Sequence, residues 1–364
     1  MKQSKKENWD ALQEKVNFLK KPVAYLEKCT RIKAIETHMS WVFLRIKAIE
    51  THMSWVFLTE HYAYKLKKPV TLPFLDLSSL SARKTNCCKE CRINQELAAG
   101  IYLEVLPLMK NERQEFLTVG AQTQGEVVDY LLKMKRIPLH LTLERVLTDQ
   151  AQFSVAKLKE AANVLLQFYQ KAQPIKLNSN DFLQRLKNFI QANMDVLGNS
   201  HYGLQPIAVK RLHEWQLCEL QALIPIISQR VDNGQIRDCH GDLRPEHICL
   251  SDPPVIIDRL DFNDDLRIID PCDELAYLAL ECEFLGRADA GQLFITVYEQ
   301  KTQDYLSPRL IAFYKSFRAC LRARICLWHL DDPRISKPAE WLKKAKMYVN
   351  LALQALDQEA KSKG

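Results

Sequence analysis

The spacing of apolar residues changes from a helical to a strand-like pattern near the start of the chain. Residues 8–20 carry apolar side chains at helical spacing and predict a short amphipathic helix. From about residue 40 to residue 70, β-branched and aromatic clusters predict two paired strands, HMSWVFL and YAYKLKKPV. A turn at residues 59–61 joins these two strands.

A helix and three further strands are predicted next. Residues 78–98 contain no Pro or Gly and begin with serines able to cap a helix. The strands are predicted at residues 101–109, 115–122 and 126–134, with a turn-like segment between the last two. Together with the paired strands before them, these elements predict a small lobe of about five strands and one helix.

Beyond Pro138 the pattern becomes helical. Apolar positions at 3.6-residue spacing predict helices at residues 141–149, 154–172, 181–197 and 209–231. The fold class expected is therefore α+β, with two lobes. An antiparallel-sheet lobe with one helix would span residues 1–136, and a larger, mainly helical lobe would span residues 137–364.

One 14-residue sequence, RIKAIETHMSWVFL, occurs twice in tandem over residues 31–58 without a single change. Only the second copy, residues 45–58, runs directly through the turn into YAYKLKKPV. We therefore expect the second copy to form the hairpin. The first copy, residues 31–44, then has no strand position to fill, and we expect an extra edge segment or a poorly packed insertion.

The composition excludes several classes of protein. With 364 residues, 47% of them apolar, the chain can bury a sizeable core or two. We expect neither secretion nor a membrane span, because no run resembles a signal peptide or reaches roughly 18 apolar residues. Eleven cysteines, an odd number, predict free thiols in a reducing cytoplasm. For Cys87, Cys88 and Cys91 we expect helix packing, since zinc binding would need a second cysteine pair.

Charge is unevenly distributed along the chain. Between Arg237 and Gln300 there are 15 Asp and Glu against 5 Arg and no Lys, in a chain of net charge +7. This acidic segment suggests that it holds something cationic, and a divalent metal is the simplest candidate. The basic surplus elsewhere is mostly dispersed lysine without interleaved aromatic residues, so no nucleic-acid partner is expected.

The stretch from residue 237 to residue 278 carries the most informative chemistry. Asp242 and Asp258 are separated by a loop, a predicted strand, a Pro-Pro turn and a second predicted strand. Such a hairpin is expected to bring the two carboxylates close together. One carboxylate can then orient or deprotonate a hydroxyl group, while the other holds a hard cation.

These residues also resemble a known family. HGDLRPEH resembles the H-G-D-x-x-x-x-N catalytic loop of aminoglycoside-phosphotransferase-like kinases and, more distantly, the HRDLxxxN loop of protein kinases. The following IID resembles their metal-binding Asp, and YAYK resembles the VAIK strand with its phosphate-binding Lys. With further pieces such as CRINQELA and DELAYL, the chain resembles a bacterial branch of the protein-kinase-like superfamily, the aminoglycoside phosphotransferase family enzymes. The likeness covers roughly residues 35–290.

The resemblance implies an enzyme, an ATP-dependent kinase that transfers a phosphoryl group to a hydroxyl of a small-molecule acceptor. Its cofactors would be ATP and Mg²⁺, with a catalytic loop at residues 238–250 and a metal-binding segment at residues 255–273. Asp242 would orient the acceptor hydroxyl and take its proton late. Arg244 would reach the transferred phosphoryl group, and Asp258 would bind Mg²⁺.

In the small lobe, the resemblance implies a nucleotide site. Lys65 would hold the phosphates and Glu90 would fix its direction, with Lys67, on the same face of the strand, as the alternative. The backbone around Met134 would form the hinge that binds adenine. The glycine-rich loop of protein kinases is absent, and two hydroxyl residues stand in its place: Thr51 and Ser54.

His247 departs from the family pattern, which has Asn there as a second metal ligand. Imidazole is a poor ligand for hard Mg²⁺. The resemblance still assigns His247 to the metal site beside Asp258. A single-metal site, substitution by Glu246 and reduced activity are all left open.

Two other functions compete with phosphoryl transfer. A pseudokinase would bind a nucleotide or a partner without transferring phosphate. A metal-dependent hydrolase would use His240, His247 and the acidic segment, and would release phosphate without an acceptor. The sequence leaves the acceptor and the oligomeric state open.

Overall fold

The computed structural model describes residues 2–27, 35–37, 40–42, 46–50, 53–72, 75–149, 153–331 and 337–362. They divide into two compact units. Unit 1 comprises Met1–Pro138 and Ile257–Asn263, and unit 2 comprises Leu139–Ile256 and Asp264–Gly364. The predicted α+β fold, a small antiparallel sheet followed by a mainly helical part, is confirmed.

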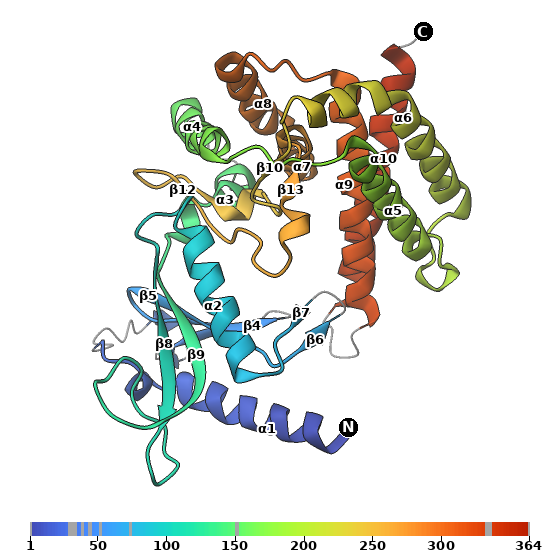
Figure 1. Ribbon diagram of the computed structural model, residues 1–364. Coiled ribbons are helices and arrows are strands. Elements are labelled where there is room, and N and C mark those ends of the chain that lie inside the picture. The colour runs from blue at the N-terminus through green and yellow to red at the C-terminus, as the bar shows by residue number, and fades with distance from the viewer. Residues whose placement is uncertain are drawn as a thin grey trace. The chain divides into compact units, whose positions relative to one another are not determined.

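Unit 1 is built on a five-stranded antiparallel sheet (Figure 1). The order of its strands is β3-β4-β5-β9-β8. Its strands are β3 (Lys47–Glu50), β4 (Ser54–Leu58), β5 (Tyr62–Lys67), β8 (Tyr102–Lys110) and β9 (Glu126–Lys135). The helices of this unit are α1 (Lys2–Leu19) and α2 (Leu80–Asn94), and a small hairpin pairs β6 (Thr71–Leu72) with β7 (Leu75–Asp76). The predicted pairing of SWVFL with YAYKLK is present as the β4–β5 ladder.

The two faces of β5 have different roles, because side chains alternate across a strand. Tyr64 and Leu66 are buried in an apolar cluster with residues of α1. On the opposite face, Lys65 and Lys67 both form ion pairs with Glu90 of α2. One face of the sheet therefore supplies the core, and the other presents charges.

Two details of the predicted sheet are wrong. Residues 115–122 do not form a strand: Phe116 and Val119 make only isolated bridges, and Gly120 adopts a positive φ of 81°. The N–H of Val119 is donated to the carbonyl of Ala24, in the turn after α1, and Phe116 stacks on Phe18 of α1. The fifth strand of the sheet is instead β3. The sequence pattern predicted no separate strand at these residues.

The second copy of the duplicated sequence supplies both β3 and β4, as expected. Within the first copy, β1 (Ile35–Thr37) pairs with β2 (Ser40–Val42), and its remaining residues lie outside the described residues. The two copies use the same register, with Ile35 opposite Val42 in one and Ile49 opposite Val56 in the other. In the part of the first copy that is described, neither strand joins the five-stranded sheet.

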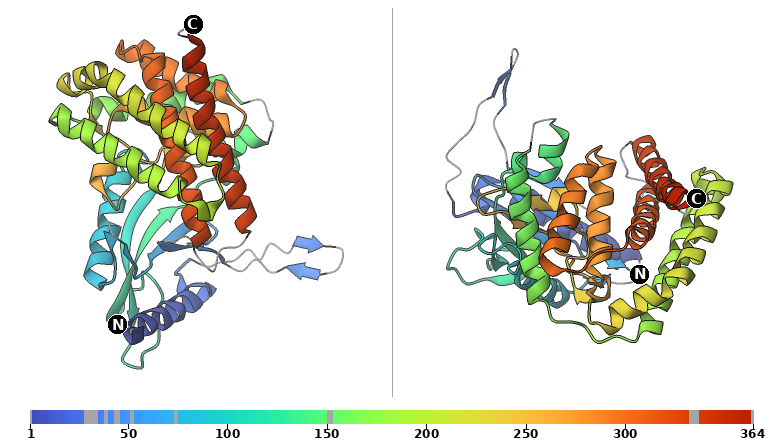
Figure 2. Two further views of the ribbon diagram at one scale, coloured as in Figure 1. Left: turned by 90° about the vertical axis from the view of Figure 1, so that its right-hand side faces the viewer. Right: turned by 90° about the horizontal axis from the view of Figure 1, so that it is seen from above.

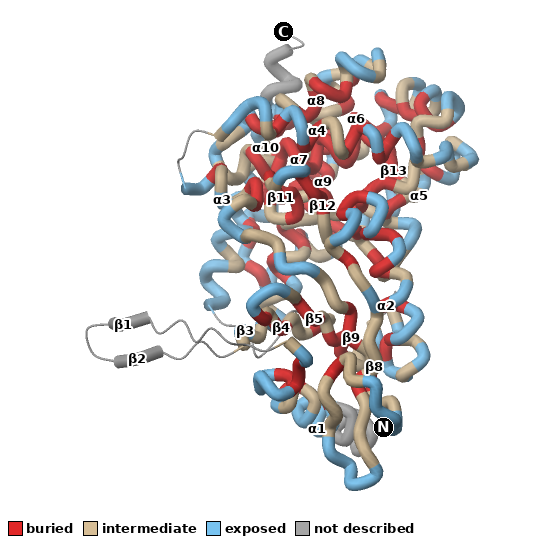
Figure 3. The backbone as a smooth tube through the Cα atoms, turned by 90° about the vertical axis from the view of Figure 1, so that its left-hand side faces the viewer, coloured by how far each residue is buried: buried red, intermediate tan, exposed pale blue. Residues whose placement is uncertain are grey.

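Unit 2 is mainly helical. Its helices are α3 (Leu143–Thr148), α4 (Val155–Lys171), α5 (Ser179–Leu197), α6 (Pro206–Asp232), α7 (Pro271–Phe284), α8 (Ala288–Thr302), α9 (Pro308–Trp328) and α10 (Pro338–Ser362). Helices α9 and α10 lie side by side in this unit (Figure 2). Helix α7 is buried over most of its length and contacts α8 and α9 (Figure 3). The core of unit 2 therefore surrounds α7.

Two short strand pairs position the loops of unit 2. β10 (Arg237–Asp238) pairs with β13 (Ile268–Ile269), and β11 (Ile248–Cys249) pairs with β12 (Val255–Ile256). The predicted hairpin after HGDLRPEH is thus present. The predicted metal-binding segment, residues 255–273, is divided between the units, because residues 257–263 are held by contacts to β5, β8 and α2 and belong to unit 1.

The described part of the chain contains no helix that is both long and apolar enough to cross a membrane. Its ten cysteines are all free thiols. Burial raises the pKa of the Cys87 thiol to about 12, so this cysteine is a protonated, buried side chain. Cys91 is also buried in α2, which agrees with a packing role for this cluster.

Candidate active site

Lys65 lies between two carboxylates in unit 1. Its Nζ is 2.7 Å from Oε1 of Glu90 and 3.1 Å from Oδ1 of Asp258. The structure therefore brings together three residues that the sequence assigned to the nucleotide and metal sites: a lysine of β5 and a glutamate of α2 for the nucleotide, and an aspartate of the 257–263 segment for the metal. The assigned roles in binding stay predictions.

The charges around Lys65 keep it cationic. Burial alone would lower the pKa of its ammonium group. Asp258 and Glu90 outweigh that effect and hold the pKa of Lys65 well above its ordinary value. Lys65 is thus a fixed positive charge, as a ligand for phosphate oxygens must be.

A second lysine shares Glu90. Lys67 forms ion pairs with Oε2 of Glu90 and, at 2.7 Å, with Oδ2 of Asp261. The side chain of Lys67 is only 4% exposed, against 15% for Lys65. Sequence reasoning missed Asp261, because its partner Lys67 is 194 residues away in the chain.

The segment carrying Asp258 is anchored by backbone hydrogen bonds. The N–H of Asp258 is donated to the hydroxyl of Tyr102 at 2.9 Å, and the N–H of Arg259 to Oδ1 of Asn94 at 2.8 Å. Asp258 itself has a φ of 61°, a left-handed conformation that non-glycine residues rarely adopt. Its side chain is 48% exposed. The fold thus holds the backbone in an unusual conformation and leaves the carboxylate accessible.

The remaining predicted nucleotide residues are placed as follows. Ser54 is buried at the start of β4, opposite Lys67, and Thr51 lies outside the described residues. Met134 is held within the sheet, opposite Ala63 on one side and Tyr102 on the other.

The backbone beyond Met134 is already hydrogen-bonded. Lys135 donates its N–H to the carbonyl of Ile101, and Arg136 donates its N–H to the carbonyl of His61, both at 2.8 Å. Adenine recognition in a hinge here would therefore have to use other backbone groups than these two donors.

Asp242 lies in the loop between β10 and β11 of unit 2 and is surrounded by donors. Its Oδ1 accepts a hydrogen bond from the hydroxyl of Tyr277 at 3.1 Å, and its Oδ2 lies 3.0 Å from Nη2 of Arg244. Burial opposes ionisation, but Arg244, with His247 and Arg322, outweighs it and holds the pKa of Asp242 below its ordinary value. Asp242 is therefore an ionised, oriented carboxylate.

The backbone of this loop is fixed by two side chains. The N–H of Asp242 is donated to Nδ1 of His240, a fully buried imidazole. Glu274 of α7, also fully buried, accepts the N–H of Gly241 at 2.6 Å and the N–H of His240 at 3.1 Å. Burial raises the pKa of Glu274, and the backbone donors and Tyr169 oppose that rise. Sequence reasoning missed Glu274, whose buried position within a helix pattern carried no distinguishing signal.

His247 is engaged through both ring nitrogens. Its Nδ1 is 2.8 Å from the backbone carbonyl of Asp242, which requires a proton on Nδ1. Its Nε2 lies 3.3 Å from Nη2 of Arg244, and the guanidinium is necessarily the donor. This arrangement fits a loop brace better than the predicted metal ligand. The described residues also contain no group of three or more His, Cys, Asp or Glu arranged to hold a metal.

Arginines form ion pairs with several carboxylates of the acidic segment, which the charge count did not anticipate. Arg230 of α6 forms a bidentate pair with Asp270, and Arg318 of α9 forms one with Asp273 at 2.7 and 2.6 Å. Further pairs are Arg322 with Glu281, Arg267 with Asp238 and Arg244 with Glu246. Three of these arginines come from α6 and α9, which are distant in sequence, so a local charge count cannot show their ion pairs.

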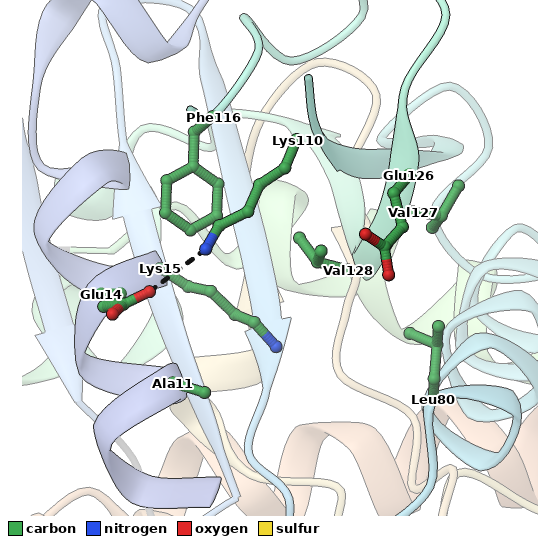
Figure 4. Close-up of a pocket in the computed structure, with 9 residues that line it drawn as sticks. All are labelled: Ala11, Glu14, Lys15, Leu80, Lys110, Phe116, Glu126, Val127 and Val128. Carbon is green, nitrogen blue, oxygen red and sulfur yellow. Dashed lines mark hydrogen bonds and ion pairs between the residues drawn. The ribbon is translucent and has the colours of Figure 1, made fainter. Parts of the chain in front are cut away.

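Unit 1 also contains a pocket of about 330 Å³ between α1, the β8–β9 pair and the start of α2 (Figure 4). Four charged residues contribute to its lining: Glu14, Lys15, Lys110 and Glu126. Both lysines are paired, Lys110 with Glu14 at 3.2 Å and Lys15 with Asp129 at 2.7 Å. None of the predicted site residues lines this pocket.

Comparison with known sequences finds distant relatives. No protein-family model matches the chain. It is 28% identical, over 268 residues, to uncharacterized proteins of Mycobacterium tuberculosis and Mycobacterium bovis. The match covers 72% of this chain and 51% of the relatives, so the chain spans about half the length of the curated proteins it matches.

Comparison with solved structures identifies the fold. A choline kinase from Cryptosporidium parvum is similar over 87% of this chain and 90% of that protein, with a TM-score of 0.51 and 12% identity. A choline/ethanolamine kinase family protein from Mesorhizobium loti matches over 85% and 91%, with a TM-score of 0.47 and 14% identity. Aminoglycoside 2'-phosphotransferase-IIIa, solved with GDP, matches over 83% and 92%, with the same TM-score and identity. The chain therefore has the protein-kinase-like fold that the choline kinase exemplifies.

Proposed function

We propose that the chain is an ATP-dependent phosphotransferase that transfers the γ-phosphoryl group to a hydroxyl of a small molecule. The observation that carries the proposal is Lys65, held between Glu90 and Asp258 in unit 1. A buried, permanently charged lysine aligned by a helix glutamate is the arrangement that binds nucleotide phosphates in protein-kinase-like folds. The fold shared with a choline kinase supports the same class of reaction.

Asp242 would act on the acceptor. Its carboxylate is ionised, and the hydroxyl of Tyr277 and the guanidinium of Arg244 fix its orientation. An ionised carboxylate can accept the hydrogen bond of an acceptor hydroxyl and take up its proton as phosphoryl transfer proceeds. Arg244 carries a positive charge beside Asp242 and is suited to stabilise negative charge on the phosphoryl group.

Of the two residues assigned to the metal site, only Asp258 is suited to bind Mg²⁺. Mg²⁺ commonly takes one or two protein carboxylates and completes its shell with phosphate oxygens and water. The half-exposed carboxylate of Asp258 meets that requirement, whereas both nitrogens of His247 are engaged. When bound, the ion would neutralise charge on the nucleotide phosphates. We therefore assign the metal to Asp258 and a bracing role to His247.

The acceptor would be a small hydroxylated molecule, and the reaction would take place in the cytoplasm. The free thiols of all ten described cysteines support a reducing compartment. The choline kinase with the same fold is named for a small hydroxylated substrate.

Nucleotide binding without transfer is the second candidate function. It is favoured by His247, which occupies the position of the second metal ligand and is bonded to the loop instead. Under this alternative Lys65 and Asp258 would still bind the nucleotide, and Asp242 would have no catalytic role.

A paired assay separates the two functions. Binding of Mg-ATP would be measured by calorimetry, and transfer by ATP consumption over a panel of hydroxylated acceptors. We expect binding, and acceptor-dependent ATP consumption that is lost in Asp242→Asn. Binding that is unaffected by Asp242→Asn, with no consumption for any acceptor, would favour the second candidate. Phosphate release that needs no acceptor would instead indicate a hydrolase.

A further inference from the structure

We propose that Lys67 and Asp261 are positioning residues: Lys67 keeps Glu90 ion-paired while Lys65 binds phosphate, and Asp261 tethers the segment that carries Asp258. The inference rests on the proposed function. It gives a role to two buried residues that the mechanism above does not use.

The contacts of Glu90 show why one lysine is insufficient. Glu90 is only 1% exposed, and its two carboxylate oxygens face two different lysines, Oε1 facing Lys65 and Oε2 facing Lys67. A buried carboxylate that loses its counter-charge is strongly destabilised. When a nucleotide competes for Lys65, Lys67 still neutralises Glu90, so the site does not lose its alignment as it binds its ligand.

Exposure separates the roles of the two lysines. Asp258, the second partner of Lys65, is 48% exposed, whereas Asp261, the second partner of Lys67, is 11% exposed. The Lys65 pair is thus the accessible side of the cluster, and the Lys67 pair is its closed side. A ligand can reach Lys65 without disturbing Lys67, which makes Lys67 unsuited to be the alternative phosphate ligand that the sequence allowed.

The charge of the cluster supports the same division. Glu90, Asp258 and Asp261 carry three negative charges, and Lys65 and Lys67 carry two positive ones. Removing Lys67 would leave a more negative cluster beside the polyanionic phosphates of a nucleotide, which repels them.

Asp261 also anchors the segment that carries Asp258. It ties residues 257–263 to β5 through Lys67, at 2.7 Å, only three residues after Asp258. The backbone of Asp258 is in a left-handed conformation, which requires the surrounding contacts to hold it. Loss of the Asp261 charge should therefore loosen Asp258 and weaken Mg²⁺ binding more than nucleotide binding.

The test compares Lys67→Met, Lys67→Arg and Asp261→Asn, with Lys84→Met as the matched control on the exposed side of α2. Nucleotide affinity, the Mg²⁺ dependence of that affinity and the melting temperature would be measured for each full-length variant. We expect Lys67→Met to weaken Mg-ATP binding by about 10-fold or more, because Glu90 loses its second cation. Lys67→Arg should restore most of the affinity, and Lys84→Met should match the wild type.

Asp261→Asn keeps Lys67 paired with Glu90 and tests the tether even if Lys67→Met fails to fold. We expect it to raise the Mg²⁺ concentration needed for half-maximal nucleotide binding at least about threefold, with little change in binding measured without Mg²⁺. A folded Lys67→Met with wild-type affinity, or an Asp261→Asn with wild-type Mg²⁺ dependence, would overturn the inference. A wild-type protein that binds no nucleotide would instead overturn the proposed function.

Discussion

Lys65 and Glu90 are 25 residues apart in sequence, and their side chains meet at 2.7 Å across the interface of β5 and α2. The pair requires the sheet register that places Lys65 opposite Val56 and Leu132, because a shift of one residue would turn Lys65 toward the apolar cluster on α1. The ion pair is thus a property of the fold of unit 1, and under the proposed function it marks the nucleotide site.

Replacing Lys65 should impair binding without unfolding the protein. In Lys65→Met, Glu90 keeps its ion pair with Lys67, so we expect the melting temperature to fall little. Loss of a charged hydrogen bond to phosphate should weaken Mg-ATP affinity by about 10- to 100-fold. Calorimetric titration checks this, with Lys84→Met as the control. Wild-type affinity in folded Lys65→Met would remove Lys65 from the site.

The pH dependence of activity should depend on Arg244. The pKa of Asp242 lies below its ordinary value of about 4, so the carboxylate is ionised above that pH and should not limit turnover between about pH 5 and pH 9. In Arg244→Met, burial still raises the pKa of Asp242 while its principal cation is gone. We expect the acidic limb of the kcat/KM profile to move to higher pH.

The exposed Arg211 pairs with Asp357 on the surface, so Arg211→Met is the matched control for that profile. Its acidic limb should stay where the wild-type limb lies. If Arg244→Met lowers activity equally at every pH, Arg244 does not act through the ionisation of Asp242.

Breaking the buried pair of Arg318 and Asp273 should destabilise unit 2. Arg318→Met leaves a buried carboxylate without its bidentate partner, which typically costs about 3–5 kcal/mol. Burial already raises the pKa of Asp273, and the loss of Arg318 should raise it further. A raised pKa means that stability falls as pH rises through it, so the defect should be largest at neutral pH and should lessen toward acid.

Denaturant unfolding at several pH values measures this defect. The double variant Asp273→Asn with Arg318→Met removes both charges and should recover part of the lost stability. A defect of equal size at acidic and neutral pH would argue that packing, rather than charge, is lost with Arg318.

Deleting residues 31–44 should leave the nucleotide site intact. Strand β4 pairs with β5, and β3 pairs with β4. Both β3 and β4 come from the second copy, residues 45–58. We expect the deletion variant to fold and to show the same nucleotide-induced rise in melting temperature as the full chain. Deleting residues 45–58 instead would give the same final sequence, so one deletion variant tests both copies. Loss of nucleotide binding on deleting residues 31–44 would show that both copies are needed.

Local patterns predicted the elements that bury one face. The alternation around Tyr64 and Leu66 identified β5, and the helical spacing around Leu12 and Val16 identified α1. The strand predicted at residues 115–122 failed because Val119 donates its N–H to Ala24, in the turn after α1, instead of to a neighbouring strand. Apolar content alone does not distinguish a strand from a loop that packs on a helix.

The charged residues of the candidate site were predictable only where they belong to a recognisable sequence motif. Asp242, Asp258 and Lys65 stand in recognisable sequence contexts. The buried Glu274 and Asp261 do not, because their partners are backbone N–H groups and a lysine distant in sequence. The ion pairs of the acidic segment were not predictable for the same reason: arginines such as Arg318 reach it only in the folded chain.

The central claim is phosphoryl transfer that depends on Asp242. The most direct measurement is ³¹P NMR of Mg-ATP incubated with the protein and a panel of hydroxylated acceptors, for the wild type and for Asp242→Asn. We expect that, with at least one acceptor, the γ-phosphate resonance disappears and a phosphate-ester resonance grows, and that Asp242→Asn prevents both. Ester formation that continues unchanged in Asp242→Asn would contradict this claim.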